Sequence, residues 1–324
     1  MKHILTLIFL LFLLPPTIPA IKLENRMPES VWQAEISLKI VPSYSRAFNG
    51  YGEEAPLQNL MLWDRGWFDL VEGELKREEK RLELKLAYGL TEDWVVEAMI
   101  PMVQKIQSSS LKFDAGTPDQ QKVISNLSSE ELNGLGDINI QFGKDLSYST
   151  TWHNRGGFTT RLPTGNKGMR RGISSNSIGE GHGSVGAFIH VTWYPLVHGI
   201  RNCFRMEGKN ELTGERETLE GEKVYYSAGH RADLYYSWSI ERQNVFAGTE
   251  LHYFQQSESK LPTGESNASF LKEINFEFGY GNLSELEQKP LSYPWQVRIG
   301  YTRPFAGQNT PLIHRWELSS TFLF

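Results

Sequence analysis

Two polar side chains near the middle of the sequence have the types and spacing of a nucleophile and its base. His182 and Ser184 stand two positions apart, so on an extended strand they share one face. A serine hydrolase also needs a third group that orients the histidine, and the sequence around this pair indicates none. The glycines at 179, 181 and 183 indicate a loop instead. A phospholipase-like activity is therefore the weaker interpretation, and we expect the protein not to be an enzyme.

The other residues with metal or redox chemistry are scattered. His190 and His252 are single histidines on different predicted strands, and Cys203 is the one cysteine of the chain. No histidine and cysteine spacing is typical of zinc, so we expect no metal site and no cofactor. The net charge is -5, the pI is about 6.0 and lysine and arginine do not cluster, which disfavours nucleic acid as a partner.

The segments that carry these side chains alternate between apolar and polar residues. From Trp32 to Ile40 every second residue is apolar, and the residues between them include Glu35 and Lys39. This period of two is typical of a strand with one apolar and one polar face. It recurs along the whole chain, with one weaker segment near residues 200–207. We count about twelve strands, within a range of 10–14. After residue 20 no stretch has the roughly 18 apolar residues of a membrane-spanning helix.

The connections between these segments alternate in length. Long, polar connections are expected at about residues 42–77, 105–134, 165–182, 208–230, 255–270 and 305–313. The others are short, except Gly281 to Pro294. Short periplasmic turns and longer outer loops are typical of bacterial outer-membrane barrels, and an even strand count places both termini in the periplasm. We therefore predict an all-β protein, a single antiparallel transmembrane β-barrel in the outer membrane of a Gram-negative bacterium.

The charged residues of the polar faces must then point into the barrel, because a lysine or arginine facing lipid near the midplane costs about 2–4 kcal/mol. They either line a water-filled lumen or pair with one another across it without conduction. The predicted lumen-lining residues, histidines included, are Glu35, Lys39, Arg81, Glu83, Lys85, Glu97, Asp137, Arg161, His190, Asp233, Glu250, His252, Glu277, Arg298, Arg315 and Glu317.

Aromatic residues mark one end of the apolar faces. In this register an interfacial girdle on the periplasmic side comprises Trp32, Tyr88, Trp94, Trp152, Trp193, Trp238, Tyr280, Trp295 and Phe324, while Trp316 marks the opposite rim. A soluble β-sandwich also alternates, but it buries its apolar face and has no reason to align tryptophans at one end of many strands. The girdle therefore favours outer-membrane lipid as the surrounding medium.

The first twenty residues have the layout of a secretory signal peptide. Lys2 precedes an apolar stretch from Ile4 to Leu14, which prolines follow, and Ala20 suits the position before a cleavage site. A retained anchor is the alternative, but the apolar run is short of the ~20 residues that span a bilayer. We expect residues 1–20 to be removed and residues 21–324 to form the barrel.

The segment from Gly50 to Gly73 is too apolar for a loop surrounded by water. It contains Trp63, Trp67 and Phe68, which make it a candidate plug or aromatic binding loop folded into the barrel. An extra hairpin or a packed rim is the alternative interpretation.

The chain ends on Phe324, preceded at every second position by apolar residues. This ending resembles the terminal signal that the barrel-assembly machinery of the outer membrane binds. Ordered local strings go further: Ala87 to Thr91 with Trp94 and Ile100-Pro101, Gly134 to Ile138, Arg161 to Gly165, Gly179 to Gly183, Ser227 to Tyr235, Gly300-Tyr301, and Arg303-Pro304 with Gly307 to Asn309. Over roughly residues 80–324 they resemble the family named after the meta-pathway of phenol degradation, outer-membrane transporters found near genes of aromatic catabolism.

The sequence therefore predicts an outer-membrane channel or transporter for small hydrophobic or aromatic compounds. The alternative, from a different functional class, is a non-conducting barrel whose long outer loops bind a partner. The composition of the loops fits both.

Overall fold

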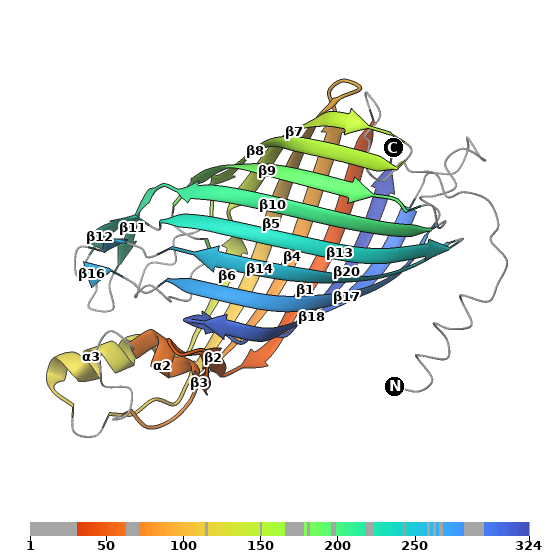
Figure 1. Ribbon diagram of the computed structural model, residues 1–324. Coiled ribbons are helices and arrows are strands. Elements are labelled where there is room, and N and C mark those ends of the chain that lie inside the picture. The colour runs from red at the N-terminus through yellow and green to blue at the C-terminus, as the bar shows by residue number, and fades with distance from the viewer. Residues whose placement is uncertain are drawn as a thin grey trace, which may run out of the picture.

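Twelve long strands and the short strand β6 form one antiparallel sheet that closes on itself (Figure 1). The structure is a computed structural model that describes residues 31–62, 71–113, 116–149, 151–165, 178–179, 182–195, 199–217, 223–227, 229–242, 244–257, 260–261, 264–265, 268–281 and 295–323. The long strands are β1 (Trp32–Tyr44), β4 (Leu75–Gly89), β5 (Trp94–Ser109), β7 (Ile138–Tyr148), β8 (Trp152–Leu162), β9 (Ser184–Trp193), β10 (Ile200–Glu211), β13 (His230–Arg242), β14 (Val245–Gln256), β17 (Ser269–Gly281), β18 (Trp295–Gln308) and β20 (Arg315–Leu323).

The first and last strands seal the barrel. β1 pairs with β20 from Gln33↔Leu323 to Ile40↔Trp316, and β4 pairs with both β1 and β5. β5 pairs with β7 from Trp94 to Met99 and with the short strand β6 (Glu130–Leu135) from Met102 to Gln107. The predicted barrel of about twelve antiparallel strands is therefore confirmed.

Alternate side chains of each strand face opposite sides of the wall. The apolar ones mostly face outward and the charged ones mostly face inward, the reverse of a soluble protein. Phe158 and Leu318, on the outward face, are 69% and 51% exposed, whereas the inward carboxylates Glu83 and Asp233 are 5% and 1% exposed. An apolar surface that surrounds a barrel is stable in lipid and not in water. Together with closure, it places this chain in the outer membrane. No helix among the described residues is long and apolar enough to cross a membrane.

Two details differ from the sequence-based expectation. β10 is a full strand of twelve residues, although the segment near 200–207 was expected to be weak. Its outward face holds Asn202 between apolar residues, and this interrupted the pattern that sequence reasoning relies on. The connection expected at 305–313 is also shorter, because β18 continues to Gln308. The long connections share one end of the barrel, except the one that joins Gly281 of β17 to Trp295 of β18. That connection lies at the opposite end, where β1 begins and β20 ends.

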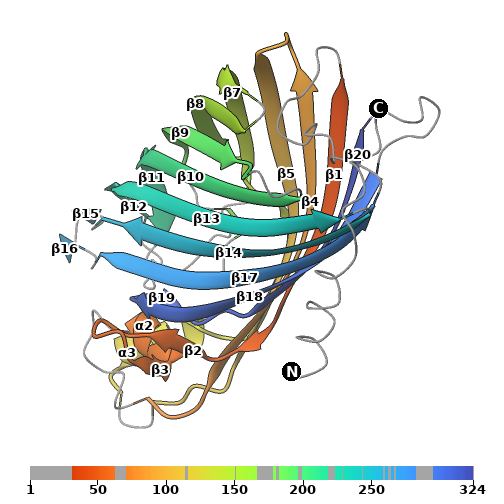
Figure 2. The same cartoon turned by 45° about the vertical axis from the view of Figure 1, so that its right-hand side comes forward.

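A small packed unit, which we call the rim unit, lies at the long-loop end beside β1 and β18 (Figures 1 and 2). It consists of β2 (Arg46–Phe48), β3 (Glu54–Pro56), α2 (Leu57–Leu62), α3 (Pro118–Asn126) and β19 (Thr310–Pro311). Thr117 begins α3 with a reciprocal capping box to Gln120. The core of the rim unit consists mainly of Leu57, Ile124 and Leu127, and Leu75 of the barrel strand β4 packs against them.

The described part of the 50–73 segment thus forms a hairpin and a helix packed at the rim, which agrees with the alternative interpretation of that segment. Trp63, Trp67 and Phe68 lie outside the described residues, as do residues 1–20 and Phe324. A second small sheet at the same end joins β11 (Thr213–Glu217), β12 (Lys223–Ser227), β15 (Lys260–Leu261) and β16 (Gly264–Glu265) (Figure 2).

Candidate functional site

The interior face of the barrel carries a dense set of charges, and neighbouring strands hold them in pairs. Lys39 of β1 donates to Glu83 of β4 at 2.6 Å, and Lys85 of β4 lies 2.8 Å from Glu97 of β5. The pairs arise because inward residues of adjacent antiparallel strands stand almost opposite each other. Glu83 stands opposite Ser37 and Glu97 stands opposite Ala87, so each carboxylate is one diagonal step from its lysine.

The ion pairs run along the wall. Arg298 of β18 reaches Glu35 of β1 at 3.2 Å and Arg315 of β20 reaches Glu273 of β17 at 3.6 Å, in each case across one intervening strand. The ion pairs named above each join strands no more than two positions apart around the sheet.

A carboxylate, an imidazole and a second carboxylate form a chain on β13, β14 and β17. Asp233 accepts two hydrogen bonds from Arg231, at 2.8 and 3.0 Å, and its Oδ1 lies 3.1 Å from Nε2 of His252. The other ring nitrogen of His252 is 2.9 Å from Glu273, and the ring stacks on Tyr235 at 4.1 Å. Since each ring nitrogen faces a carboxylate oxygen, a doubly protonated ring satisfies both contacts.

A second cluster lies on the interior face of β5, β8, β9, β10 and β13. The guanidinium of Arg205 lies over the rings of Phe188 and Tyr235, at 5.8 and 5.7 Å, and binds Glu207 at 2.8 Å. Arg205 also interacts electrostatically with Glu97 of β5, four strands away around the sheet. Arg155 of β8 approaches the same carboxylate to 3.9 Å. We call Glu97, Arg155, Phe188, Arg205 and Tyr235 the eyelet.

Sequence reasoning missed four of these five eyelet residues and found only Glu97. Because the segment near 200–207 was taken as weak, the parity of Arg205 was not assigned. The signal was present, since Ile200, Phe204 and Met206 share the outward parity and leave Arg205 on the other face. The same parity places the predicted His190 beside Cys203, with Nε2 and Sγ 2.6 Å apart.

Other predicted interior residues are also placed by their strands. Glu317 lies 3.9 Å from Lys39, and Arg81 lies 2.9 Å from Glu79. Glu277 accepts a hydrogen bond from Asn275 at 2.8 Å, and Glu250 stands opposite Asn275 in the register of β14 and β17.

Asp137 and Arg161 lie at the long-loop rim, where they fix a connection. Oδ1 of Asp137 accepts the N–H of Gly165 at 2.9 Å. A Cβ added to Gly179 would lie 2.5 Å from that same oxygen, so only a glycine fits there without displacement. Asp137 therefore lies between the two ends of the connection between β8 and β9. Gly165 and Gly179 belong to two of the strings that carried the family resemblance.

The hydrolase hypothesis needs one correction. His182 does have a third group, because its Nε2 lies 3.1 Å from Glu211, which also binds Arg161. Glu211 escaped notice because it lies 29 residues away in sequence. Ser184, however, is 1% exposed, and its hydroxyl has no hydrogen-bond partner in the described part of the chain. His182 and Ser184 are thus not joined as a nucleophile and base must be.

The girdle residues within the described chain lie on the outward face, and six of them contact one another in pairs across strands. Trp32 packs on Tyr88 at 4.6 Å, and Trp152 stacks on Trp193 at 5.9 Å. Trp94, Trp238 and Tyr280 are each more than one third exposed, and Trp295 is partly exposed beside Tyr280.

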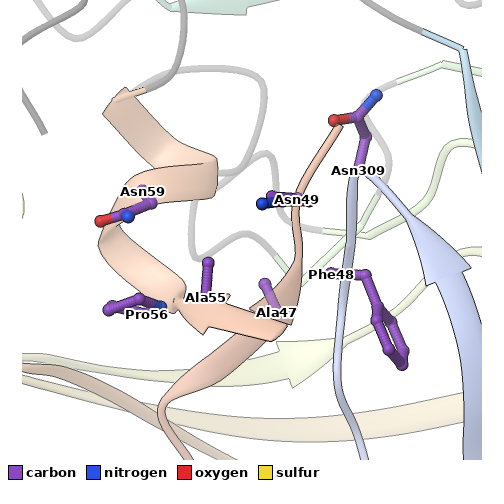
Figure 3. Close-up of a pocket in the computed structure, with 7 residues that line it drawn as sticks. All are labelled: Ala47, Phe48, Asn49, Ala55, Pro56, Asn59 and Asn309. Carbon is purple, nitrogen blue, oxygen red and sulfur yellow. The ribbon is translucent and has the colours of Figure 1, made fainter. Parts of the chain in front are cut away.

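A small pocket lies outside the lumen, in the rim unit. It is lined by Ala47, Phe48, Asn49, Ala55, Pro56, Asn59 and Asn309, which come from β2, β3, α2 and the turn before β19 (Figure 3). Among the described residues, no group of three or more histidine, cysteine or acidic side chains is arranged to hold a metal ion.

Comparison with known proteins finds likeness in structure alone. No protein-family profile and no curated protein matches the sequence. The fold resembles the crystal structure of the COG4313 outer membrane channel from Pseudomonas putida F1, with a TM-score of 0.66, 13% identity and coverage of 93% of this chain and 98% of that one. The TodX deltaS2S3 mutant monoaromatic hydrocarbon channel matches with a TM-score of 0.42, 9% identity and coverage of 91% and 90%. The second score is too low to carry a conclusion, and the first shows the fold. The family expected from the local strings therefore stays a prediction.

Proposed function

We propose that this chain is an outer-membrane channel that passes small solutes through its charged lumen. The observation that carries the proposal is the course of the ion pairs along the wall. Charges that are neutralised by neighbours on the wall keep the interior polar and hydrated without requiring a partner on the opposite wall.

The eyelet supports a finer proposal, that the solutes are small hydrophobic or aromatic compounds. Phe188 and Tyr235 present ring faces on both sides of the Arg205 guanidinium. Such a site offers stacking and a cation to a planar molecule, and a planar anion such as benzoate satisfies both.

The alternative proposal is a non-conducting barrel that binds a partner at its long-loop end. The rim unit favours it, because a dedicated core around Leu57 and the second small sheet are more ordered structure than a pore opening requires. The two proposals differ in a single measurable property, ion conduction.

Planar-bilayer recording of the purified, folded protein tests the proposal. We expect stepwise conductance, partial block by millimolar benzoate, and a shift of ion selectivity toward cations in Arg205→Gln. Arg46→Gln, in the rim unit and paired with Glu54 at 3.3 Å, is the matched control and should leave selectivity unchanged. Absence of conductance from folded protein would favour the partner-binding barrel. Conductance without any block by benzoate would overturn the aromatic assignment alone.

Three further roles are proposed on the sequence. Residues 1–20 act as a cleaved signal peptide, Phe324 binds the barrel-assembly machinery, and Trp63, Trp67 and Phe68 restrict the pore. N-terminal sequencing of the mature protein tests the first and the yield of folded barrel after deletion of Phe324 tests the second. The third predicts a higher conductance when the segment between Gly50 and Gly73 is shortened.

A further inference from the structure

Two cations stand on the outer surface of the barrel wall, where the apolar band ends. Lys272 of β17 shares outward parity with Ile274 and Phe276, and Arg303 of β18 pairs directly with Ile274. Both cations are exposed. Aromatic side chains on the neighbouring outward positions complete the surface. We call Tyr253, Phe270, Lys272, Arg303, Phe305 and Trp316 the basic-aromatic patch.

The level of these cations in the membrane follows from the strands. Lys272 is eight residues from Tyr280 and Arg303 is eight residues from Trp295, both of the periplasmic girdle. Eight residues rise ~26 Å along a strand, or ~20 Å along the membrane normal at a tilt of ~40°. The apolar band of such barrels is ~25 Å tall, so the patch lies at its extracellular edge.

Within the part of the chain that the structure describes, no carboxylate pairs with the two cations of this surface. Nζ of Lys272 lies over the rings of Tyr253 and Phe270, at 5.9 and 6.0 Å, and within the described residues neither Lys272 nor Arg303 has an ion-pair partner. The outward positions of β17, β18 and β20 from the girdle up to the patch contain no Asp or Glu. The nearest acidic residues in sequence, Glu273 and Glu317, point inward and pair with His252 and Lys39.

Among the described residues, the outward wall carries one further cation at this level, Lys80 of β4, eight residues from Tyr88 of the girdle. The corresponding outward positions on β5, β8 and β9, eight residues from the girdle, are Met102, Thr160 and Val185. Lys80 differs from Lys272 and Arg303 because Glu131 interacts with it electrostatically. A lysine and an arginine at the edge of the hydrocarbon are stabilised electrostatically by an anion. An anion that carries its own apolar chains is held at the same level of the membrane.

We propose that the basic-aromatic patch binds a phosphate group of a phosphorylated glycolipid in the outer leaflet. Arg303 and Lys272 donate charge-assisted hydrogen bonds to the phosphate oxygens, and the outward aromatic rings pack against the acyl chains. Phe305 and Trp316, 56% and 48% exposed, flank Arg303 on the same outward surface. This role concerns the lipid around the barrel and does not depend on the proposed conduction through it.

The test is lipid binding by the full-length protein in detergent, measured by native mass spectrometry with bisphosphorylated lipid A as the probe. We expect saturable binding to the wild type, and a Kd at least tenfold weaker for Lys272→Gln combined with Arg303→Gln. Lys144→Gln is the matched control. Lys144 is also outward and lies over the Trp94 ring at 5.5 Å, but at the periplasmic girdle. A heat-modifiable shift in gel migration verifies that each variant is folded.

Three outcomes would overturn the proposal. The first is equal binding by the double variant, and the second is equal loss in Lys144→Gln. The third is equal binding of lipid A from which both phosphates have been removed. Binding of inorganic phosphate with the same loss in the double variant, together with no binding of lipid A to the wild type, would instead assign the patch to a free anion. Retention of binding in Arg303→Lys, with loss only in the neutral variants, would support charge as the determinant.

Discussion

Adjacent residues of β7 allow the inside-out wall to be tested one position at a time. Ile140 faces outward, four residues from Lys144, which stands opposite Trp94 of the girdle. Four residues rise ~13 Å along the strand, or ~10 Å along the membrane normal, which is near the middle of a ~25 Å apolar band. Gln141 faces inward and stands opposite Glu97.

The same charge should therefore have opposite consequences at the two positions. Ile140→Arg places a guanidinium near the midplane of the lipid and should cost about 2–4 kcal/mol of unfolding free energy. Since 1.4 kcal/mol is a factor of ten, the folding equilibrium constant should fall roughly 30- to 700-fold. Gln141→Arg places it in the hydrated interior beside the Glu97 carboxylate, where a change within about 1 kcal/mol is expected.

The assay is reversible unfolding of the barrel from phospholipid vesicles by guanidinium chloride, followed through tryptophan fluorescence. The wild type and both arginine variants are compared at one lipid composition and one pH. A loss in Gln141→Arg that equals or exceeds the loss in Ile140→Arg would refute the assignment of faces. It would also remove the basis for the lumen and for the basic-aromatic patch.

Three further predictions concern the interior, a rim connection and the rim unit. Asp233→Asn, at a 1% exposed carboxylate bound by Arg231, should cost about 2–3 kcal/mol in the same unfolding assay, because it leaves the guanidinium without its charged acceptor; an unchanged midpoint would contradict this. Gly179→Ala should accelerate proteolysis of the connection between β8 and β9, because the new Cβ would lie 2.5 Å from an Asp137 oxygen, whereas a Cβ at the control Gly208 meets nothing within 4 Å. Leu57→Ala, at a fully buried site, should lower the stability of the rim unit by about 2–5 kcal/mol. Hydrogen exchange should then speed up in α2 and α3 with the barrel amides unaffected, and uniform acceleration would show that the rim unit is not a separate packed body.

The sequence by itself determined the barrel. A closed wall between lipid and an aqueous interior requires every second residue to be apolar, and that requirement is written locally, residue by residue, from Trp32 to the end of β20. Where the pattern was interrupted, as at Asn202 in β10, the strand was underestimated and the interior residue Arg205 was missed. β10 nevertheless forms a complete strand, because its backbone is hydrogen-bonded to β9 on one side and to β13 on the other.

Only the tertiary structure decided which charges meet. His182 and Glu211 are 29 residues apart, and Arg298 and Glu35 are 263 residues apart. The position of a residue in the alternating pattern predicts which face of the wall it lies on. It does not predict its level along the barrel axis, because that depends on the register shift between strands in the closed sheet. That shift brings Arg205 toward Glu97 and sets Lys272 beside Arg303. The eyelet and the basic-aromatic patch are therefore properties of the closed barrel and of no single strand.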